Sequence, residues 1–178
     1  MRSRIITIFL ISFLAACAQP SNYQNMVVYS SPSLVVPDEA KNSIAVKGVT
    51  GGDETNPLGV SKVDAQAFKT ALVQSLDNLR LLSREGNEFI TVSAHVHDLI
   101  QPMFGLNFSV TSIVSYTVET SSRKKVFNVT AVGDATMGDA FYGVTRLRMA
   151  NEKSIQNNIE NFTVRLVDFL SQETNLIN

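Results

Sequence analysis

The chain is poor in the residues from which many functional sites are built. Its 178 residues include one cysteine, two histidines and no tryptophan. A single cysteine excludes a disulfide framework within the chain and a cysteine-rich zinc site. Charged residues make up only 17% of the chain, and the formal net charge is -1. A nucleic-acid-binding protein is therefore not expected, because such proteins present a clustered basic face.

Motifs of the common enzyme classes are also missing. The sequence contains no G-x-S-x-G, H-E-x-x-H, C-x-x-C or G-x-G-x-x-G pattern. Its serines are not accompanied by a histidine placed to activate them. We therefore expect no catalytic residues, no metal and no cofactor, and we expect that the protein is not an enzyme.

The first residues have the pattern of a secretory signal. Basic residues precede the ten-residue apolar run 5–14, and small residues then lead to Cys17. The run Leu14-Ala15-Ala16-Cys17 resembles the lipobox of bacterial lipoproteins. This resemblance implies that residues 1–16 are a cleaved signal peptide and that Cys17 carries a covalent lipid. The alternative is an ordinary signal peptide with an incidental cysteine.

A lipidated Cys17 implies a location as well as a modification. Several acyl chains, palmitate among them, give stable membrane anchoring, whereas one chain alone is marginal. Ala18 stands after the cysteine, and the lipoprotein resemblance implies the outer membrane when that position is not aspartate. We therefore expect a protein that is lipid-anchored at the periplasmic face of the outer membrane.

Residues 17–41 are expected to form the lipidated cysteine and a flexible tether. Residues 18–41 contain three prolines, four serines and two asparagines and show no sustained period. As a flexible coil this segment would span roughly 27 Å, and fully extended about 80 Å. It holds two apolar clusters, 27–29 and 34–36, and one of these is a candidate to dock on the domain as an edge strand.

Residues 42–178 are expected to form one periplasmic α+β domain. Alternating apolar residues predict strands, and apolar residues spaced by three and four predict helices. The predicted elements are a strand at 43–50, a helix at 61–79, strands at 90–97, 106–119 and 126–132, and a helix at 146–171. Phe162 and Leu166 lie at the centre of the apolar seam of the last helix and should be buried.

The order β-α-β-β-β-α predicts a two-layer domain. A helical crossover makes the first two strands parallel, and short connections make the last three strands an antiparallel meander. The fold class is therefore α+β, with a four-stranded, mostly antiparallel sheet and two helices on one face. The other face should be polar.

Two groups of polar residues are candidates for chemical sites. His95 and His97 leave the same face of a strand, a spacing that can supply two zinc ligands, but adjacent Asp98 points to the opposite face. A metal-dependent enzyme at this pair is one reading, and two solvated histidines is the reading we favour. The loop 51–56 holds two carboxylates and two glycines, which predicts an acidic turn more than an acid–base site.

Aromatic residues gather in two loops. Phe104 lies in the loop 102–105, and Phe141 and Tyr142 lie in the loop 137–142. Both loops follow strands that run the same way, so they should emerge at the same end of the sheet. These three rings are candidates for partner contact. The alternative is that they fold back and plug the ends of the sheet.

The lipobox, the tether and the element order resemble periplasmic lipoproteins that assist envelope transport. The LPS-assembly lipoprotein and the auxiliary lipoproteins of ABC-type lipid transporters share such a domain. Residues 50–58 and 141–152 are also similar to stretches of small uncharacterised lipoproteins. The resemblance implies a non-catalytic accessory or scaffold subunit in cell-envelope assembly or lipid transport, with a protein partner in the envelope. The alternatives are a periplasmic lipid or small-ligand binding protein and the metal-dependent enzyme.

Overall fold

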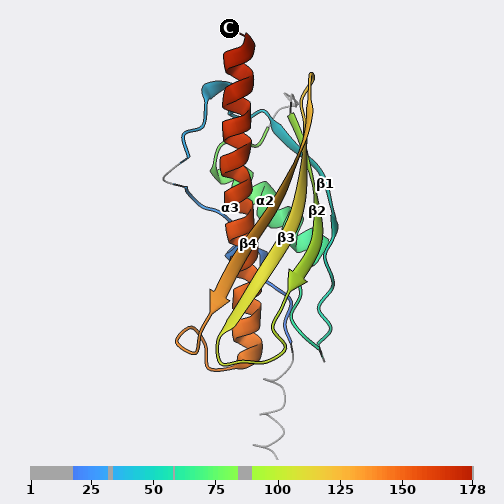
Figure 1. Cartoon of the computed structure of the whole chain (residues 1–178), viewed down its shortest axis with the longest axis vertical. Helices are drawn as coiled ribbons and strands as arrows, with labels where there is room; N and C mark the ends of the chain where they lie inside the picture. The colour runs from blue at the N-terminus through green and yellow to red at the C-terminus, as the bar shows by residue number, and fades with distance from the viewer. Residues whose placement is uncertain (1–17, 32–33, 58, 84–89, 178) are drawn as a thin grey trace, which may run out of the picture.

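The computed structural model describes residues 18–31, 34–57, 59–83 and 90–177 (Figure 1). Cys17 and the expected signal peptide 1–16 lie outside the described residues. The main elements are β1 (Ile44–Gly51), α2 (Ala65–Asn78), β2 (Ile90–Ile100), β3 (Phe108–Glu119), β4 (Lys124–Ala135) and α3 (Gly143–Ile177). This is the predicted order. Over the described part of the chain, no helix combines the length and the hydropathy that crossing a membrane requires.

The four strands form one mixed sheet in the order β1-β2-β3-β4. β1 pairs with β2 in parallel, and the pairs β2–β3 and β3–β4 are antiparallel. Both features confirm the prediction, because α2 supplies the crossover between the parallel strands and the later connections are short.

One bulge changes which residues of β2 face solvent. The register of β2 against β3 shifts between Val96 and Asp98, so His97 is an extra residue in the strand. Strict alternation places Asp98 on the core face, and that expectation is wrong. His97 and Asp98 are both exposed, and the core face resumes at Leu99.

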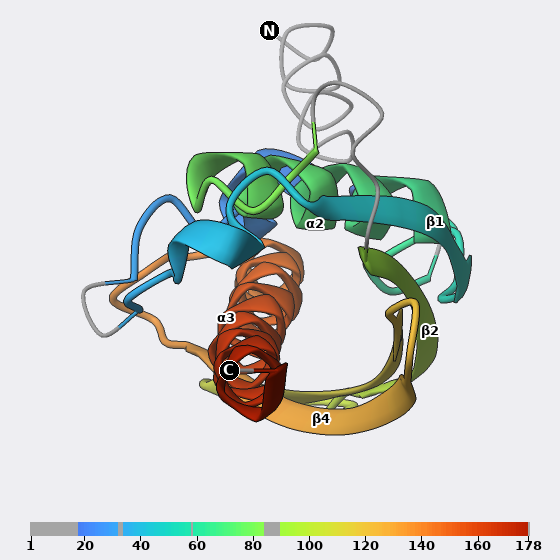
Figure 2. The ribbon, with the colours of Figure 1, turned by 90° about the horizontal axis from the view of Figure 1, so that it is seen from above.

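Both helices cover the same face of the sheet. α3 packs against β3 and β4, and α2 packs against β1. Figure 2 shows the sheet curving around α3, with α2 beside β1. The two-layer α+β arrangement is therefore the predicted one. α2 begins later than expected, because the Asp64 side chain caps it by accepting a hydrogen bond from the Ala67 N–H at 2.8 Å.

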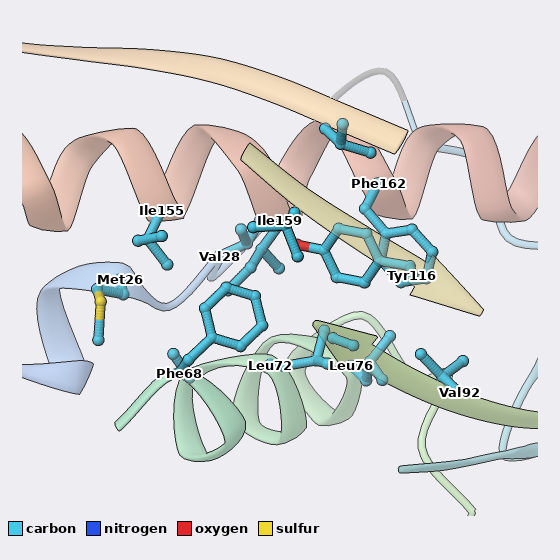
Figure 3. Close-up of a cluster of buried hydrophobic side chains, with 14 of the residues drawn as sticks. Met26, Val28, Phe68, Leu72, Leu76, Val92, Tyr116, Ile155, Ile159 and Phe162 are labelled. Carbon is cyan, nitrogen blue, oxygen red and sulfur yellow. The ribbon is translucent and has the colours of Figure 1, made fainter. Parts of the chain in front are cut away.

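Aromatic rings from three elements meet at the centre of the core (Figure 3). The Tyr116 ring of β3 stacks on the Phe162 ring of α3 with a centroid distance of 3.8 Å. Phe68 of α2 approaches Tyr116 from the other side, at 6.2 Å. Phe162 and Leu166 are both fully buried, which confirms the seam predicted for the last helix.

A network of polar groups around Asn158 of α3 crosses this core. Asn158 is fully buried, and its Oδ1 accepts a hydrogen bond from the Tyr116 hydroxyl at 2.9 Å. The Asn158 amide donates to the Val129 carbonyl at 3.0 Å and to the Ser112 hydroxyl at 3.1 Å. These bonds satisfy buried polar groups and fix α3 against both β3 and β4.

α3 and β4 approach most closely at Gly133. A Cβ atom at this position would lie 2.1 Å from the Ser154 nitrogen and 2.4 Å from the Ala150 carbonyl oxygen. Both atoms belong to the backbone of α3, so no side-chain movement can make room. Glycine at this position therefore sets the distance between the helix and the sheet.

The segment 18–31, here called the strap, differs from the expected flexible tether. Met26, Val27 and Val28 are 0%, 1% and 3% exposed and belong to the main core. The strap carries a 3-10 helix at Tyr23–Met26 and packs between α2 and α3. It does dock, but not as an edge strand, because the sheet contains only β1 to β4 among the described residues. The folded unit therefore begins before the expected boundary at residue 42.

The strap is held by side chains that patterning does not reveal. The Glu152 carboxylate of α3, 2% exposed, accepts hydrogen bonds from the Asn22 N–H at 2.7 Å and the Asn25 amide at 2.8 Å. On the other side, the Val28 N–H donates to the Ser75 hydroxyl of α2 at 2.9 Å. The tether expectation is wrong here because these polar groups, together with the buried apolar cluster, offset the entropy of ordering the segment.

Candidate functional site

Several loops meet at one end of the sheet. The strand directions place the ends of β1, β2 and β4 at the same end, together with the start of β3. Figure 1 shows these connections at the bottom of the molecule, beside the first turns of α3. The topology therefore gathers the loops 102–105 and 137–142 at one end, as predicted, and the loop that follows β1 lies there as well.

The loops at this end expose large apolar side chains. Met103 is 94% exposed, Phe104 86%, Phe141 78% and Tyr142 58%. These rings do not plug the sheet, so that alternative is wrong. We use the name apolar end for the seven side chains of Ile100, Met103, Phe104, Leu106, Met137, Phe141 and Tyr142, each at least half exposed.

The Arg146 side chain holds the backbone of the loop that carries Phe141 and Tyr142. The Arg146 guanidinium of α3 donates to the carbonyl oxygens of Ala140 at 2.8 Å and Phe141 at 2.7 Å. It also lies over the Phe108 ring, 5.6 Å from the centroid. Arg146 is only 5% exposed, so its charge is committed to holding the loop. The two exposed rings are therefore presented outward on a fixed backbone.

The single charged residue within the loop 136–142 is also tied to its neighbours. The Asp139 carboxylate accepts hydrogen bonds from the Thr136 N–H at 2.7 Å and from the Thr136 hydroxyl at 2.8 Å. The backbone hydrogen bond is the main reason that the pKa of Asp139 is lowered. This carboxylate consequently stays ionised and closes the turn.

The strap enters the domain at this same end. The Ala18 N–H donates to the Pro57 carbonyl at 3.0 Å, and Ala18 is 5% exposed. Arg148, in the second turn of α3, donates to the Gln19 side chain at 2.6 Å. The first described residue is therefore fixed against the loop that follows β1. Cys17, the predicted lipidation site, directly precedes it in the sequence.

The two histidines lie on the exposed face of the sheet and contact polar neighbours. His95 Nδ1 is 2.9 Å from the Thr50 hydroxyl, and His97 Nε2 is 2.7 Å from the Ser115 hydroxyl. The Ser115 hydroxyl donates to Asn128 Oδ1 at 2.6 Å, so it accepts from His97, which is not the arrangement of an activated nucleophile. In the described ranges, no group of three or more His, Cys, Asp or Glu side chains is placed to hold a metal ion.

The glycines of the acidic loop after β1 are required by its backbone conformation. Gly51 and Gly52 adopt φ values of 75° and 71°, a region that favours glycine. A Cβ at Gly51 would lie 2.1 Å from the Val96 carbonyl oxygen. Asp53 forms an ion pair with Lys62 at 3.5 Å, and both Asp53 and Glu54 are exposed. The residues form a turn that closes on β2 and the segment before α2.

Sequence reasoning missed three residues that shape the apolar end. Leu106 is the first residue of the strand predicted at 106–119, but β3 begins only at Phe108 and Leu106 is 69% exposed. Ile100 lies beyond the bulge in β2 and is 53% exposed. Arg146 carries no local pattern that marks it as a brace, since its partners are backbone carbonyl oxygens.

Comparisons with known proteins support the fold alone. No family model matches this sequence, and no curated protein matches it. Among solved structures, the hypothetical protein CT253 from Chlamydia trachomatis is 13% identical and has a TM-score of 0.50, over 72% of this chain and 96% of that one. The same arrangement of strands and helices therefore occurs in a bacterial protein of very different sequence.

Two further solved structures show weaker likeness. Protein XCC0632 from Xanthomonas campestris, of the family DUF330, is 10% identical with a TM-score of 0.49, over 89% of this chain and 85% of that one. A candidate lipoprotein from Caulobacter crescentus is 13% identical with a TM-score of 0.40, over 57% of this chain and 82% of that one. The resemblance to the LPS-assembly lipoprotein stays a prediction.

Proposed function

We propose that this chain is a non-catalytic lipoprotein that serves as an accessory or scaffold subunit in cell-envelope assembly or lipid transport. Acyl chains on Cys17 would anchor it at the periplasmic face of the outer membrane. The observation that carries the proposal is the apolar end, a group of seven exposed apolar side chains at one end of the sheet, six on loops and Ile100 at the end of β2. Loops gathered on a rigid scaffold are a usual place for recognition. Phe104, Phe141 and Tyr142 are therefore the proposed contact with another envelope component.

The geometry gives less support to the two alternatives. A lipid or small-ligand binding protein would need space between the helices and the sheet, where Phe68, Tyr116 and Phe162 pack against one another. A metal-dependent enzyme would need a third ligand beside His95 and His97. The accessory role uses surfaces that are exposed and needs no rearrangement of the core.

The anchoring is tested by replacing the lipidated residue. Cys17→Ser in the full-length chain should lose incorporation of labelled fatty acid and should leave the membrane fraction or retain its signal peptide. The wild-type chain should carry the label and sediment with outer-membrane vesicles. Persistent labelling of the variant would contradict the anchoring at Cys17.

The accessory role is tested by purification from the envelope. The acylated wild-type protein, crosslinked in cells and extracted in mild detergent, should co-purify with an envelope complex in fixed stoichiometry. A bound lipid recovered with the protein alone would favour the ligand-binding alternative. Near-stoichiometric zinc would favour the enzyme. A protein that purifies with neither partner nor ligand would contradict the accessory role.

A further inference from the structure

We propose that the component contacted by the apolar end is the lipid bilayer itself. On this view the exposed rings and aliphatic side chains lie in the interfacial region of the leaflet that carries the acyl chains of Cys17. The inference rests on the proposed acylation and adds a second, non-covalent membrane contact. This contact fixes how the domain stands on the membrane.

The composition of the apolar end suits a bilayer interface. Residues 100–107 contain no Asp, Glu, Lys or Arg, and Asp139 is the sole charge within 136–142. Its carboxylate is turned back onto Thr136, and the Arg146 charge is bound to carbonyl oxygens beneath the loop. Scattered exposed apolar residues are ordinary, but a cluster of seven at one end marks an interaction surface. Rings such as those of Phe and Tyr readily enter the headgroup region.

The position of the strap favours the bilayer over a protein as the occupant. Ala18 is fixed at this end by its hydrogen bond to the Pro57 carbonyl, at 3.0 Å. Consecutive Cα atoms are about 3.8 Å apart, so the acylated residue is attached within one peptide unit of a fixed point. A flexible tether of 24 residues would have let the domain stand away from the membrane. A docked strap instead holds this end at the bilayer surface.

The contact should depend on apolar burial rather than on charge. Two basic residues near the apolar end are paired with carboxylates, Lys62 with Asp53 and Arg148 with Glu152, so they do not form a free basic patch. Insertion should therefore be insensitive to salt, unlike the attraction of a basic patch to anionic lipid.

The experiment uses Cys17, the only cysteine of the chain, whose sulfur does not react with a thiol dye once it is acylated. The acylated Met103→Cys variant is labelled with an environment-sensitive dye and placed in vesicles of phosphatidylethanolamine and phosphatidylglycerol. The matched control is Val126→Cys, an exposed apolar position, 52% exposed, near the start of β4 at the opposite end of the sheet. Lipids with a nitroxide on the acyl chain serve as the quencher.

The dye at position 103 should shift to the blue and lose most of its emission to the nitroxide lipid, at low and at high salt. The dye at position 126 should do neither. Adding Phe104→Ser and Phe141→Ser to the Met103→Cys variant should restore most of the emission, whereas adding Val126→Ser should not. Circular dichroism of each variant checks that the fold is retained.

Other results would overturn the inference in distinguishable ways. Acylated protein that floats with the vesicles while position 103 stays unquenched leaves the anchoring intact and removes the bilayer contact. A blue shift that grows with protein concentration, without quenching of the dye by the nitroxide lipid, identifies a second copy of the chain as the occupant. A wild-type Cys17 that reacts with the thiol dye and does not float contradicts the anchoring, and the inference falls with it.

Discussion

The hydrogen bond between Tyr116 and Asn158 should stabilise the fold by an amount that depends on pH. Tyr116→Phe removes the hydroxyl that donates to Asn158 Oδ1 at 2.9 Å and leaves that buried oxygen without this donor. A buried acceptor that loses its partner costs about 1–3 kcal/mol. At pH 7 the free energy of unfolding should therefore fall by about that amount, measured by urea denaturation. Tyr29→Phe, on a ring that is 66% exposed, is the matched control and should stay within about 0.5 kcal/mol of wild type.

Above pH 10 the free energies of unfolding of the wild-type protein and of Tyr116→Phe should converge. Burial raises the pKa of the Tyr116 phenol well above its usual value of about 10. The unfolded chain then loses the phenol proton at a pH where the folded chain still holds it. The contribution of Tyr116 to stability is present in full below pH 10 and declines by about 1.4 kcal/mol per pH unit above it.

The phenylalanine variant lacks this decline, whereas all other titrating groups are common to both proteins. The difference in stability should therefore vanish roughly one to two pH units above 10 and then change sign. A difference that stays constant from pH 7 to pH 11.5 would refute the reasoning. It would mean that burial does not raise the pKa of the Tyr116 phenol in the folded state.

Three further predictions concern the core and the histidines. Phe162→Ala should lower the free energy of unfolding by about 3–5 kcal/mol, because the ring is fully buried and stacked on Tyr116; a loss below about 1 kcal/mol in urea would mean that this face is not enclosed. Gly133→Ala should lower the free energy of unfolding by about 3 kcal/mol or more, because the added Cβ would lie 2.1 Å from the α3 backbone. An unchanged thermal midpoint would contradict that contact. Replacing His95 and His97 together by Gln should change stability by no more than about 0.5 kcal/mol, and elemental analysis should find no metal lost with them.

Most of the fold follows from hydrophobic periodicity. The seam of α3 and the alternation in β3 each have one face that must be buried, so their period identifies both the element and its orientation. The direction of each strand then follows from the lengths of the connections. The gathering of the loops 102–105 and 137–142 at one end was predictable from the strand directions, whereas the exposure of their rings was not.

The docking of the strap and the polar network around Asn158 could not be predicted from hydrophobic periodicity. Met26–Val28 is too short to show a period, and its neighbours are turn-forming residues, so composition alone indicates a tether. Asn158 sits on the buried face of α3, where patterning expects an apolar residue, and only its partners on β3 and β4 explain it. Sequence patterns report which surfaces are apolar, but they do not report which polar groups will find partners far along the chain.

The strap also sets the order in which the molecule can be completed. The Glu152 carboxylate that accepts from the Asn22 N–H belongs to a residue 130 positions later in the chain. A chain that crosses the membrane from its N-terminus presents the strap first and α3 last. The buried places of Met26 and Val28 therefore exist only after nearly the whole sequence has emerged, and closing so long a loop is slow. In the export that the proposed lipoprotein function requires, the strap therefore stays without its packing partners until α3 has followed.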